Sequence, residues 1–124
     1  MDVERRIETY EEFWAFYLGE HRSPFNRCLH YIGSSLALGL LIAAVTTQIW
    51  WLIGLAPIVG YSHAWIGHFF VEGNKPASFS YPGWSFISDF KMLNLALIGR
   101  MGPEMERLYG SRHPKDDAPC LVQF

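Results

Sequence analysis

The stretch YIGSSLALGLLIAAVTTQIWWLIGLAPIVGY, residues 31–61, has no charged side chain and is apolar all round rather than along one helical stripe. It lies within a longer segment, residues 28–71, in which none of the 44 positions carries a formal charge. A helix that is apolar on every side is either buried inside a large protein or inserted in a membrane. A chain of 124 residues is too short to surround a buried helix pair of this length, so the pattern predicts membrane segments.

The length of this segment predicts two helices rather than one, because a membrane-spanning helix needs about 20 residues. The polar run TTQ at 46–48, followed by Trp50 and Trp51, is typical of a turn at a membrane interface. We expect a helical hairpin, transmembrane or re-entrant, with arms at about 24–46 and 49–71 and a kink in the second arm near Pro57 and Gly60. All ten Lys and Arg residues lie outside residues 28–71, which by the positive-inside rule places the ends opposite the turn in the cytoplasm of a multi-pass protein.

The flanking segments predict further helices. Thr9 and Glu12 have the spacing of a capping box at the start of an interfacial helix, and Ser23 with Pro24 marks the start of the first hairpin arm. The Gly, Pro and Ser content of residues 73–84 predicts a loop. A third long helix is expected at 84–99, either in the membrane or packed on the hairpin, and a short one at 102–110. The predicted fold is all-α: one domain, residues 1–124, forming an integral membrane helical bundle with a central hairpin and interfacial helices.

Composition narrows the function classes. The formal net charge of -2 gives no indication of nucleic-acid binding. The two cysteines do not form a CxxC pair, which argues against a disulfide scaffold. The charged N-terminal sequence MDVERRIETYEEF lacks the apolar core of a signal peptide. Only 18% of the residues are charged, below the quarter or so that is usual for soluble domains.

Histidines are the main candidates for chemistry. An antiparallel hairpin brings His30, near the start of the first arm, close to His63 and His68, near the end of the second, and His21 just precedes the first arm. Four histidines are therefore expected at one membrane face, whereas His113 lies in the polar tail. Neutral imidazoles suit Fe, Zn, Cu or Ni, and they enter a low-dielectric site without the cost of burying several carboxylates.

The spacing of the histidines complicates this prediction. Residues five apart on an α-helix point about 140° from each other, so His63 and His68 share a face only if a π-bulge intervenes. Glu72 follows His68 by four residues and is expected to accept its second ring N–H. Asn26 precedes His30 by four residues and is expected to support that ring in the same way.

Two motifs carry a resemblance to a known family. They are H-x-x-P-x-N-R-x-x-H, within FYLGEHRSPFNRCLHYIG at 16–33, and H-A-W-x-x-H-F-x-x-E-x-N-x-P, within GYSHAWIGHFFVEGNKPASFSYPGWSFISDFKM at 60–92. Over roughly residues 9–95 the chain resembles the small membrane family that includes the fungal 2-hydroxy fatty acid dioxygenase of phytosphingosine breakdown.

The resemblance implies an Fe(II)-dependent α-oxidation in which a 2-hydroxy fatty acid and O2 give a fatty acid one carbon shorter. It implies histidine ligands for the iron, which carry over to His21, His30, His63 and His68. The acid is expected to reach the site from membrane lipid, with Arg27 or Lys75 available to pair with its carboxylate. Four histidine ligands would leave little room for a chelating substrate together with O2.

Other classes stay open from the sequence. Two of the histidines are enough for the axial ligands of a haem in a membrane electron-transfer protein. A non-enzymatic lipid-binding or scaffold protein would use the polar cluster only to seal helix ends. A di-iron lipid hydroxylase is disfavoured because the chain has no adjacent His pair. Substrate chain length and oligomeric state are not predicted.

Overall fold

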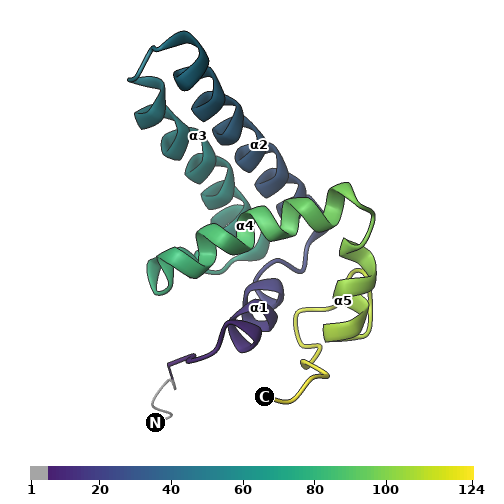
Figure 1. The fold of residues 1–124 in the computed structure, drawn as a ribbon. Coiled ribbons are helices and arrows are strands. Elements are labelled where there is room, and N and C mark those ends of the chain that lie inside the picture. The colour runs from purple at the N-terminus through teal and green to yellow at the C-terminus, as the bar shows by residue number, and fades with distance from the viewer. Residues whose placement is uncertain (1–5) are drawn as a thin grey trace.

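A computed structural model describes residues 6–124, and the regular secondary structure of these residues is entirely helical (Figure 1). The all-α prediction is confirmed, and residues 1–5 of the predicted domain lie outside the described residues. The elements are α1 (Tyr10–Gly19), α2 (Pro24–Thr47), α3 (Leu52–Ile66), a π-helix η1 (Gly67–Glu72), a 3-10 turn η2 (Ala77–Phe79), α4 (Pro82–Leu97) and α5 (Met101–Tyr109).

Helices α2 and α3 form the predicted hairpin, which projects away from the rest of the chain and from both termini (Figure 1). The turn begins at Gln48, whose φ of 60° places it in the left-handed region. The arms approach closely at Gly33, where an added Cβ would lie 2.9 Å from the Cβ of His63 and 3.0 Å from the carbonyl oxygen of Gly60. Small residues at such a crossing allow two helix backbones to pack tightly, as they do in membrane bundles.

The second arm differs from the prediction. Its α-helical part is 15 residues long, and the six residues that follow form the π-helix instead of continuing the α-helix. Within residues 6–124, α2 is the one helix that is long and apolar enough to cross a membrane by length and composition. The outer face of the hairpin is nonetheless apolar and exposed, with Ile42 55%, Val45 64% and Trp51 68% accessible. Apolar surfaces of this extent usually mark contact with a membrane or a partner.

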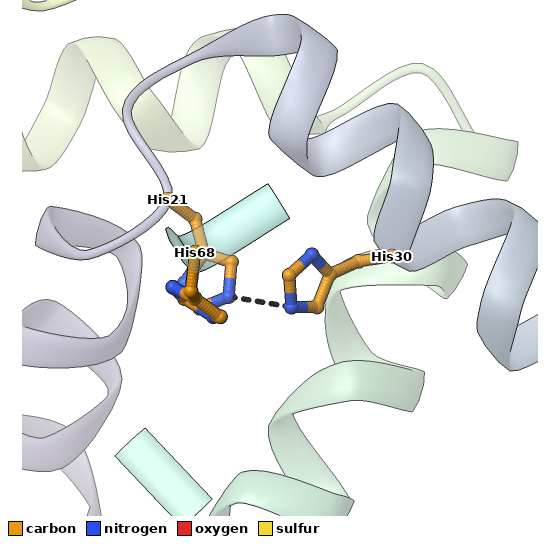
Figure 2. Close-up of side chains that lie close together, drawn as sticks. All are labelled: His21, His30 and His68. Carbon is orange, nitrogen blue, oxygen red and sulfur yellow. Dashed lines mark hydrogen bonds between the residues drawn. The ribbon is translucent and has the colours of Figure 1, made fainter. Parts of the chain in front are cut away.

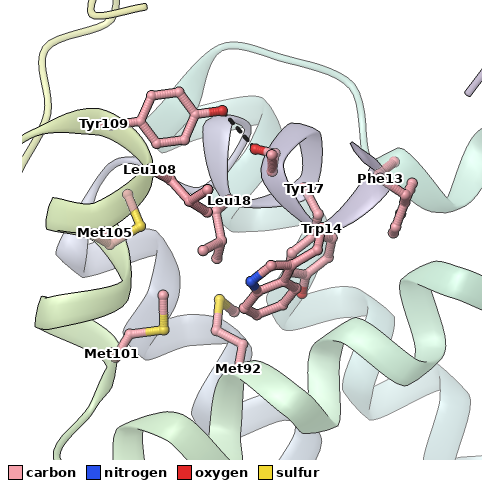
Figure 3. Packing of buried hydrophobic residues seen from close by; sticks show 11 residues of the cluster. Phe13, Trp14, Tyr17, Leu18, Met92, Met101, Met105, Leu108 and Tyr109 are labelled. Atoms are coloured by element: carbon pink, nitrogen blue, oxygen red, sulfur yellow. Dashed lines mark hydrogen bonds between the residues drawn. The ribbon is translucent and has the colours of Figure 1, made fainter. Parts of the chain in front are cut away.

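The hydrophobic core lies at the base of the hairpin, among α1, α4 and α5 (Figure 3). Phe13, Leu18, Met92 and Met105 are completely buried there. Helix α4 begins at Pro82, two residues earlier than predicted, and packs across α2 and α1. Of the two alternatives for this helix, packing on the hairpin is therefore the one that the structure supports.

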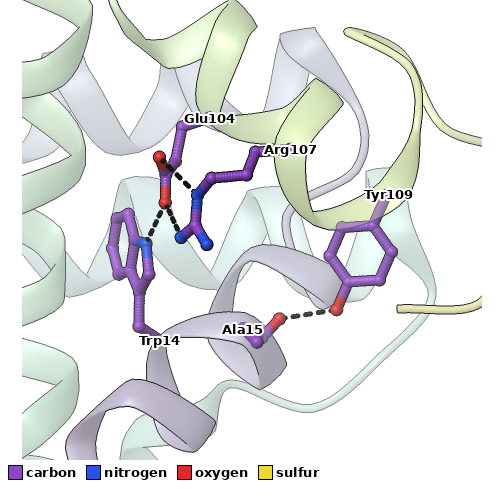
Figure 4. Close-up of polar contacts among 5 residues, drawn as sticks. All are labelled: Trp14, Ala15, Glu104, Arg107 and Tyr109. Carbon is purple, nitrogen blue, oxygen red and sulfur yellow. Dashed lines mark hydrogen bonds and ion pairs between the residues drawn. The ribbon is translucent and has the colours of Figure 1, made fainter. Parts of the chain in front are cut away.

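Polar contacts attach α5 to α1 at the edge of this core (Figure 4). The Tyr109 hydroxyl donates to the carbonyl oxygen of Ala15 at 2.5 Å, and the indole N–H of Trp14 donates to Glu104 at 3.0 Å. Arg107 forms an ion pair with the same carboxylate. The start of α1 agrees with the predicted cap, since the backbone N–H three residues after Thr9 donates to its hydroxyl. These contacts hold the end of α1, and hence the following loop, in a fixed place beneath the hairpin.

Candidate metal centre

Three elements that are distant in sequence each contribute one histidine to a single buried cluster (Figure 2). His21 lies in the short connection between α1 and α2, His30 lies in the second turn of α2, and His68 lies in η1. One ring nitrogen from each lies within 4.8 Å of the other two. The ring centroids are 4.4, 4.5 and 4.9 Å apart, and each pair of rings is nearly perpendicular. We call these residues the histidine triad.

The hydrogen bonds of the triad fix its tautomers. The Nδ1–H of His21 donates to the carbonyl oxygen of Tyr17 at 2.5 Å, and that of His30 donates to the carbonyl oxygen of Asn26 at 3.0 Å. The Nδ1–H of His68 donates to the side-chain oxygen of Asn74 at 2.6 Å. A neutral imidazole that donates through Nδ1 has a lone pair on Nε2. All three rings are therefore oriented as metal ligands, each held by a hydrogen bond from its other nitrogen.

The Nε2 atoms of His21 and His30 have no hydrogen-bond partner among residues 6–124 other than each other. The two Nε2 atoms are 3.1 Å apart. Because the Nδ1–H groups of both rings donate to carbonyl oxygens, each Nε2 carries a lone pair, and the two lone pairs repel each other. Burial, assisted by the two neighbouring imidazoles, lowers the pKa of His21 well below its usual range, which disfavours relief by protonation. A cation shared among the three nitrogens removes the repulsion. A set of three neutral imidazoles suits a divalent transition metal and leaves coordination positions open for other ligands.

The chain around His68 explains how it joins the triad. Gly73, with φ 72°, ends the π-helix in a left-handed conformation and turns the chain back, so that the backbone N–H of Asn74 donates to the carbonyl oxygen of His68 at 3.0 Å. The Asn74 side-chain amide donates to the carbonyl oxygen of Glu20 at 3.0 Å, which fixes its oxygen toward the imidazole. Asn74 thus joins the π-helix to the loop that carries His21.

Glu72 has a different role from the predicted one. It was expected to accept the second ring N–H of His68, but Asn74 occupies that place. The Glu72 carboxylate instead accepts the backbone N–H of Ser23 at 2.7 Å and the side-chain amide of Asn26 at 3.2 Å. The prediction failed because it assumed α-helical spacing after His68, whereas the π-helix rotates Glu72 toward the start of α2.

Asn26 packs against the π-helix at a point that accepts only glycine. A Cβ added to Gly67 would overlap the Asn26 side-chain oxygen. That oxygen is buried and has no hydrogen-bond partner among residues 6–124. The predicted support of His30 by Asn26 comes from its backbone carbonyl, while its side chain bonds to Glu72. Asn26 therefore joins the start of α2 to the end of the second arm.

His63, the fourth predicted ligand, is not part of the triad. Its Nδ1–H donates to the carbonyl oxygen of Val59 at 2.8 Å, one turn earlier on α3, and its Cβ packs at the close approach to Gly33. A π-helix is present, as the five-residue spacing required, but it begins at Gly67 and leaves the geometry around His63 α-helical. His63 and His68 consequently point in different directions.

The two predicted substrate cations also differ in their surroundings. Arg27 is buried, and its guanidinium donates to the backbone carbonyls of His21 (2.8 Å), Arg22 (2.7 Å) and Arg112 (3.1 Å). These bonds fix the loop that carries His21 and the C-terminal tail. Lys75 is exposed. Their pairing with a substrate carboxylate stays a prediction, and the contacts of Arg27 indicate a structural task.

Asp89 was not singled out in the sequence. It lies on α4, accepts a hydrogen bond from the Tyr17 hydroxyl, and lines the same cavity as His30. Burial raises the pKa of this carboxyl to about 6. The sequence offered one indication of it, because Asp89 is the only acidic residue between Glu72 and Glu104.

Comparison with known protein families gives a match over residues 7–101 to the family described as 2-hydroxy-palmitic acid dioxygenase Mpo1-like. The matched region contains the whole histidine triad and most of the helical body. Searches of the curated proteins and of the solved structures gave no match. The match covers most of the chain and agrees with the resemblance of the two histidine motifs, so the chain belongs to the 2-hydroxy-palmitic acid dioxygenase Mpo1-like family.

Proposed function

We propose that this protein is an iron(II)-dependent dioxygenase that converts a 2-hydroxy fatty acid and O2 into the fatty acid one carbon shorter, CO2 and water. The atoms and electrons of this reaction balance without a further reductant. The hydroxyl-bearing carbon becomes the new carboxyl, the old carboxyl leaves as CO2, and the substrate supplies all the electrons that O2 accepts. The family membership supports the substrate class and the reaction.

The observation that carries the proposal is that one ring nitrogen from each of three buried histidines lies within 4.8 Å of the other two, with the Nε2 atoms of His21 and His30 3.1 Å apart. When bound there, ferrous iron would supply the binding and activation of O2 and a centre for chelation by the hydroxyl and carboxylate of the acid. Three histidine ligands leave more open positions than the four predicted from the sequence, which removes the crowding expected for a chelating substrate together with O2.

Hydrogen bonds from the three histidines to groups of the protein orient the imidazole rings before any ion is bound. The carbonyl of Tyr17, the carbonyl of Asn26 and the side chain of Asn74 orient the three rings through their Nδ1–H groups. Preorganised ligands of this kind lose little conformational freedom when the ion binds. The triad residues are at most 4% exposed, which restricts the access of bulk water.

We further propose that the hairpin of α2 and α3 inserts into the membrane with the triad at the cytoplasmic surface. The exposed apolar faces of both arms, the length of α2, and the absence of Lys and Arg from residues 28–71 support this arrangement. A fatty acid could then pass from the bilayer to the site without crossing water.

The geometry disfavours the haem alternative. Axial haem ligands lie on opposite faces of a flat macrocycle, whereas His21 and His30 meet at 3.1 Å with a third imidazole beside them. A purely structural cluster in a scaffold protein would leave the facing lone pairs without compensation. Neither alternative accounts for three rings that are all held through Nδ1.

The test measures iron per chain and O2 uptake with 2-hydroxypalmitic acid in detergent-solubilised protein purified without chelator. We expect His68→Ala to lose most of its iron and all turnover, because it removes one of three ligands. His63→Ala should keep its iron, since His63 bonds to the backbone of its own helix. His113→Ala is the matched control from the exposed tail and should equal the parent.

Two results would contradict the proposal. Full iron and full uptake in His68→Ala would place the site elsewhere. A parent protein that retains only zinc, with uptake that does not respond to added Fe(II), would exclude iron as the working metal. Loss of iron in His63→Ala without loss of folding would restore the four-ligand set predicted from the sequence.

A further inference from the structure

A cavity of about 340 Å³ lies between α2, α3 and α4, and it reaches the triad at His30. Helix α2 contributes four residues at helical spacing along one face: His30, Ser34, Ala37 and Leu41. His30 is thus both a member of the triad and a wall of the cavity. A ligand that fills the cavity would therefore contact the triad through His30.

The polarity of the cavity changes along its length. Four lining residues carry a polar group, namely His30, Ser34, Tyr61 and Asp89, and α4, which carries Asp89, crosses the hairpin near its base. The remaining lining is apolar, and Leu41 and Ile53 lie toward the hairpin turn. A polar end followed by an apolar groove matches a molecule with one polar head and one hydrocarbon tail.

Small residues keep the middle of the groove open. Ala37 on α2 and Gly60 on α3 both line the cavity, and neither has a side chain that extends beyond Cβ. At about 1.5 Å per residue, Leu41 lies roughly 16 Å beyond His30 along α2. That distance is on the scale of a long-chain acyl tail.

We propose that this groove binds the hydrocarbon chain of the 2-hydroxy acid and that its length from His30 to Leu41 and Ile53 sets the chain-length preference. The assignment of a 2-hydroxy acid head group rests on the proposed function. The assignment of an acyl chain to the groove rests on the apolar lining of the groove. We assign the groove to the chain of the substrate rather than to that of a bilayer phospholipid, because its polar end is formed by His30, a buried member of the triad.

The first experiment blocks the groove at two depths. Ala37→Leu fills its middle and Ile53→Trp fills its far end. The control Gly39→Leu introduces the same side chain as the first variant on the exposed face of α2, where an added Cβ meets nothing within 4 Å. Turnover is measured with 2-hydroxyoctanoic, 2-hydroxylauric and 2-hydroxypalmitic acid, together with iron per chain.

We expect a graded shift in chain-length preference. Ala37→Leu should lower kcat/KM for 2-hydroxypalmitic acid relative to 2-hydroxyoctanoic acid by about tenfold or more, the scale on which apolar pockets discriminate by size. Ile53→Trp should affect only the longest acid, and Gly39→Leu should keep the parent profile. A general loss of stability would lower all substrates together and would not produce this order. Ile53 is 46% exposed, so its replacement by Trp should not prevent folding. If Ile53→Trp binds a full complement of iron and keeps the parent ratios of kcat/KM among the three acids, the proposal is overturned, even if Ala37→Leu fails to fold.

The second experiment locates the chain without relying on turnover. A 2-hydroxypalmitic acid with a diazirine at its tail end is photolysed with the parent protein, and the labelled peptides are mapped by mass spectrometry. The proposal is supported if Leu41 and Ile53 are labelled, and if this labelling is prevented by an excess of 2-hydroxypalmitic acid without the diazirine but not by phosphatidylcholine. Labelling only at other residues, or labelling that phosphatidylcholine prevents, overturns it. If labelling falls in the groove while the parent consumes no O2, the proposed function fails and the acyl-chain site stands.

Discussion

The carboxyl of Asp89 allows a quantitative test of the structure at the polar end of the groove. It is half-buried on α4, and desolvation there raises its pKa from an ordinary value of 3.8 to about 6, although the hydrogen bond from Tyr17 favours the charged form and works in the other direction. At neutral pH the protein therefore holds an ionised carboxylate in a place that disfavours the charge. We expect Asp89→Asn, which keeps an oxygen acceptor for Tyr17, to stabilise the protein.

The sign and size of this effect follow from proton linkage. Between pH 3.8 and about 6 the folded state retains a proton that the unfolded state has lost, so the free energy of unfolding falls as the pH rises through this window. Each tenfold change in a protonation equilibrium is worth about 1.4 kcal/mol, which gives a cost on the order of 3 kcal/mol above pH 6. In a chain of this size that corresponds to roughly 10 °C in Tm.

The assay is thermal unfolding in detergent, followed by circular dichroism at several pH values from 4 to 8, for Asp89→Asn and the parent. The buried His21 has a lowered pKa and gives the opposite slope, but it is present in both proteins and cancels in their difference. That difference should be near zero at pH 4 and should grow toward pH 7. Asp117→Asn, in the exposed tail, is the control and should show none. A variant that is less stable than the parent at pH 7, or a difference that does not vary with pH, would refute the reasoning.

Two further substitutions test how the site is held. Gly67→Ala places a Cβ on the side-chain oxygen of Asn26, and the forced movement should cost about 1–3 kcal/mol in unfolding free energy and lower the iron bound per chain. The control is Gly83→Ala, where an added Cβ meets nothing within 4 Å, and it should keep both the parent Tm and the parent iron content. If the two variants lose stability and iron equally, the contact with Asn26 is not the cause of the loss in Gly67→Ala. Tyr109→Phe removes the hydrogen bond to the buried carbonyl of Ala15 and should lower the unfolding free energy by about 1 kcal/mol without changing iron content, as measured by denaturant titration and metal analysis. Loss of iron in Tyr109→Phe would contradict the separation of the α1–α5 contact from the metal centre.

Much of this protein was determined by local pattern in the sequence. The uncharged segment 28–71 with its polar interruption at 46–48 predicted the hairpin, because the helical segments and the turn between them depend on the pattern of neighbouring residues. Pro24 marked the start of α2, and Thr9 marked the cap of α1, for the same reason. The histidine motifs predicted the family, which the family match confirms, and three of the four predicted ligands lie in the triad, a group that could hold a metal ion.

The composition of the site depended on contacts that local pattern does not encode. The π-helix at Gly67–Glu72 rotated Glu72 away from His68, and the turn at Gly73 brought Asn74 back to replace it. His63 was excluded because the chain around it stayed α-helical and placed it at the contact between the two arms. Asp89 came beside His30 only because α4 packs across the base of the hairpin. Helical periodicity fixes which residues share a face over a few turns, whereas the meeting of distant faces is fixed by the loops and the packing that join them.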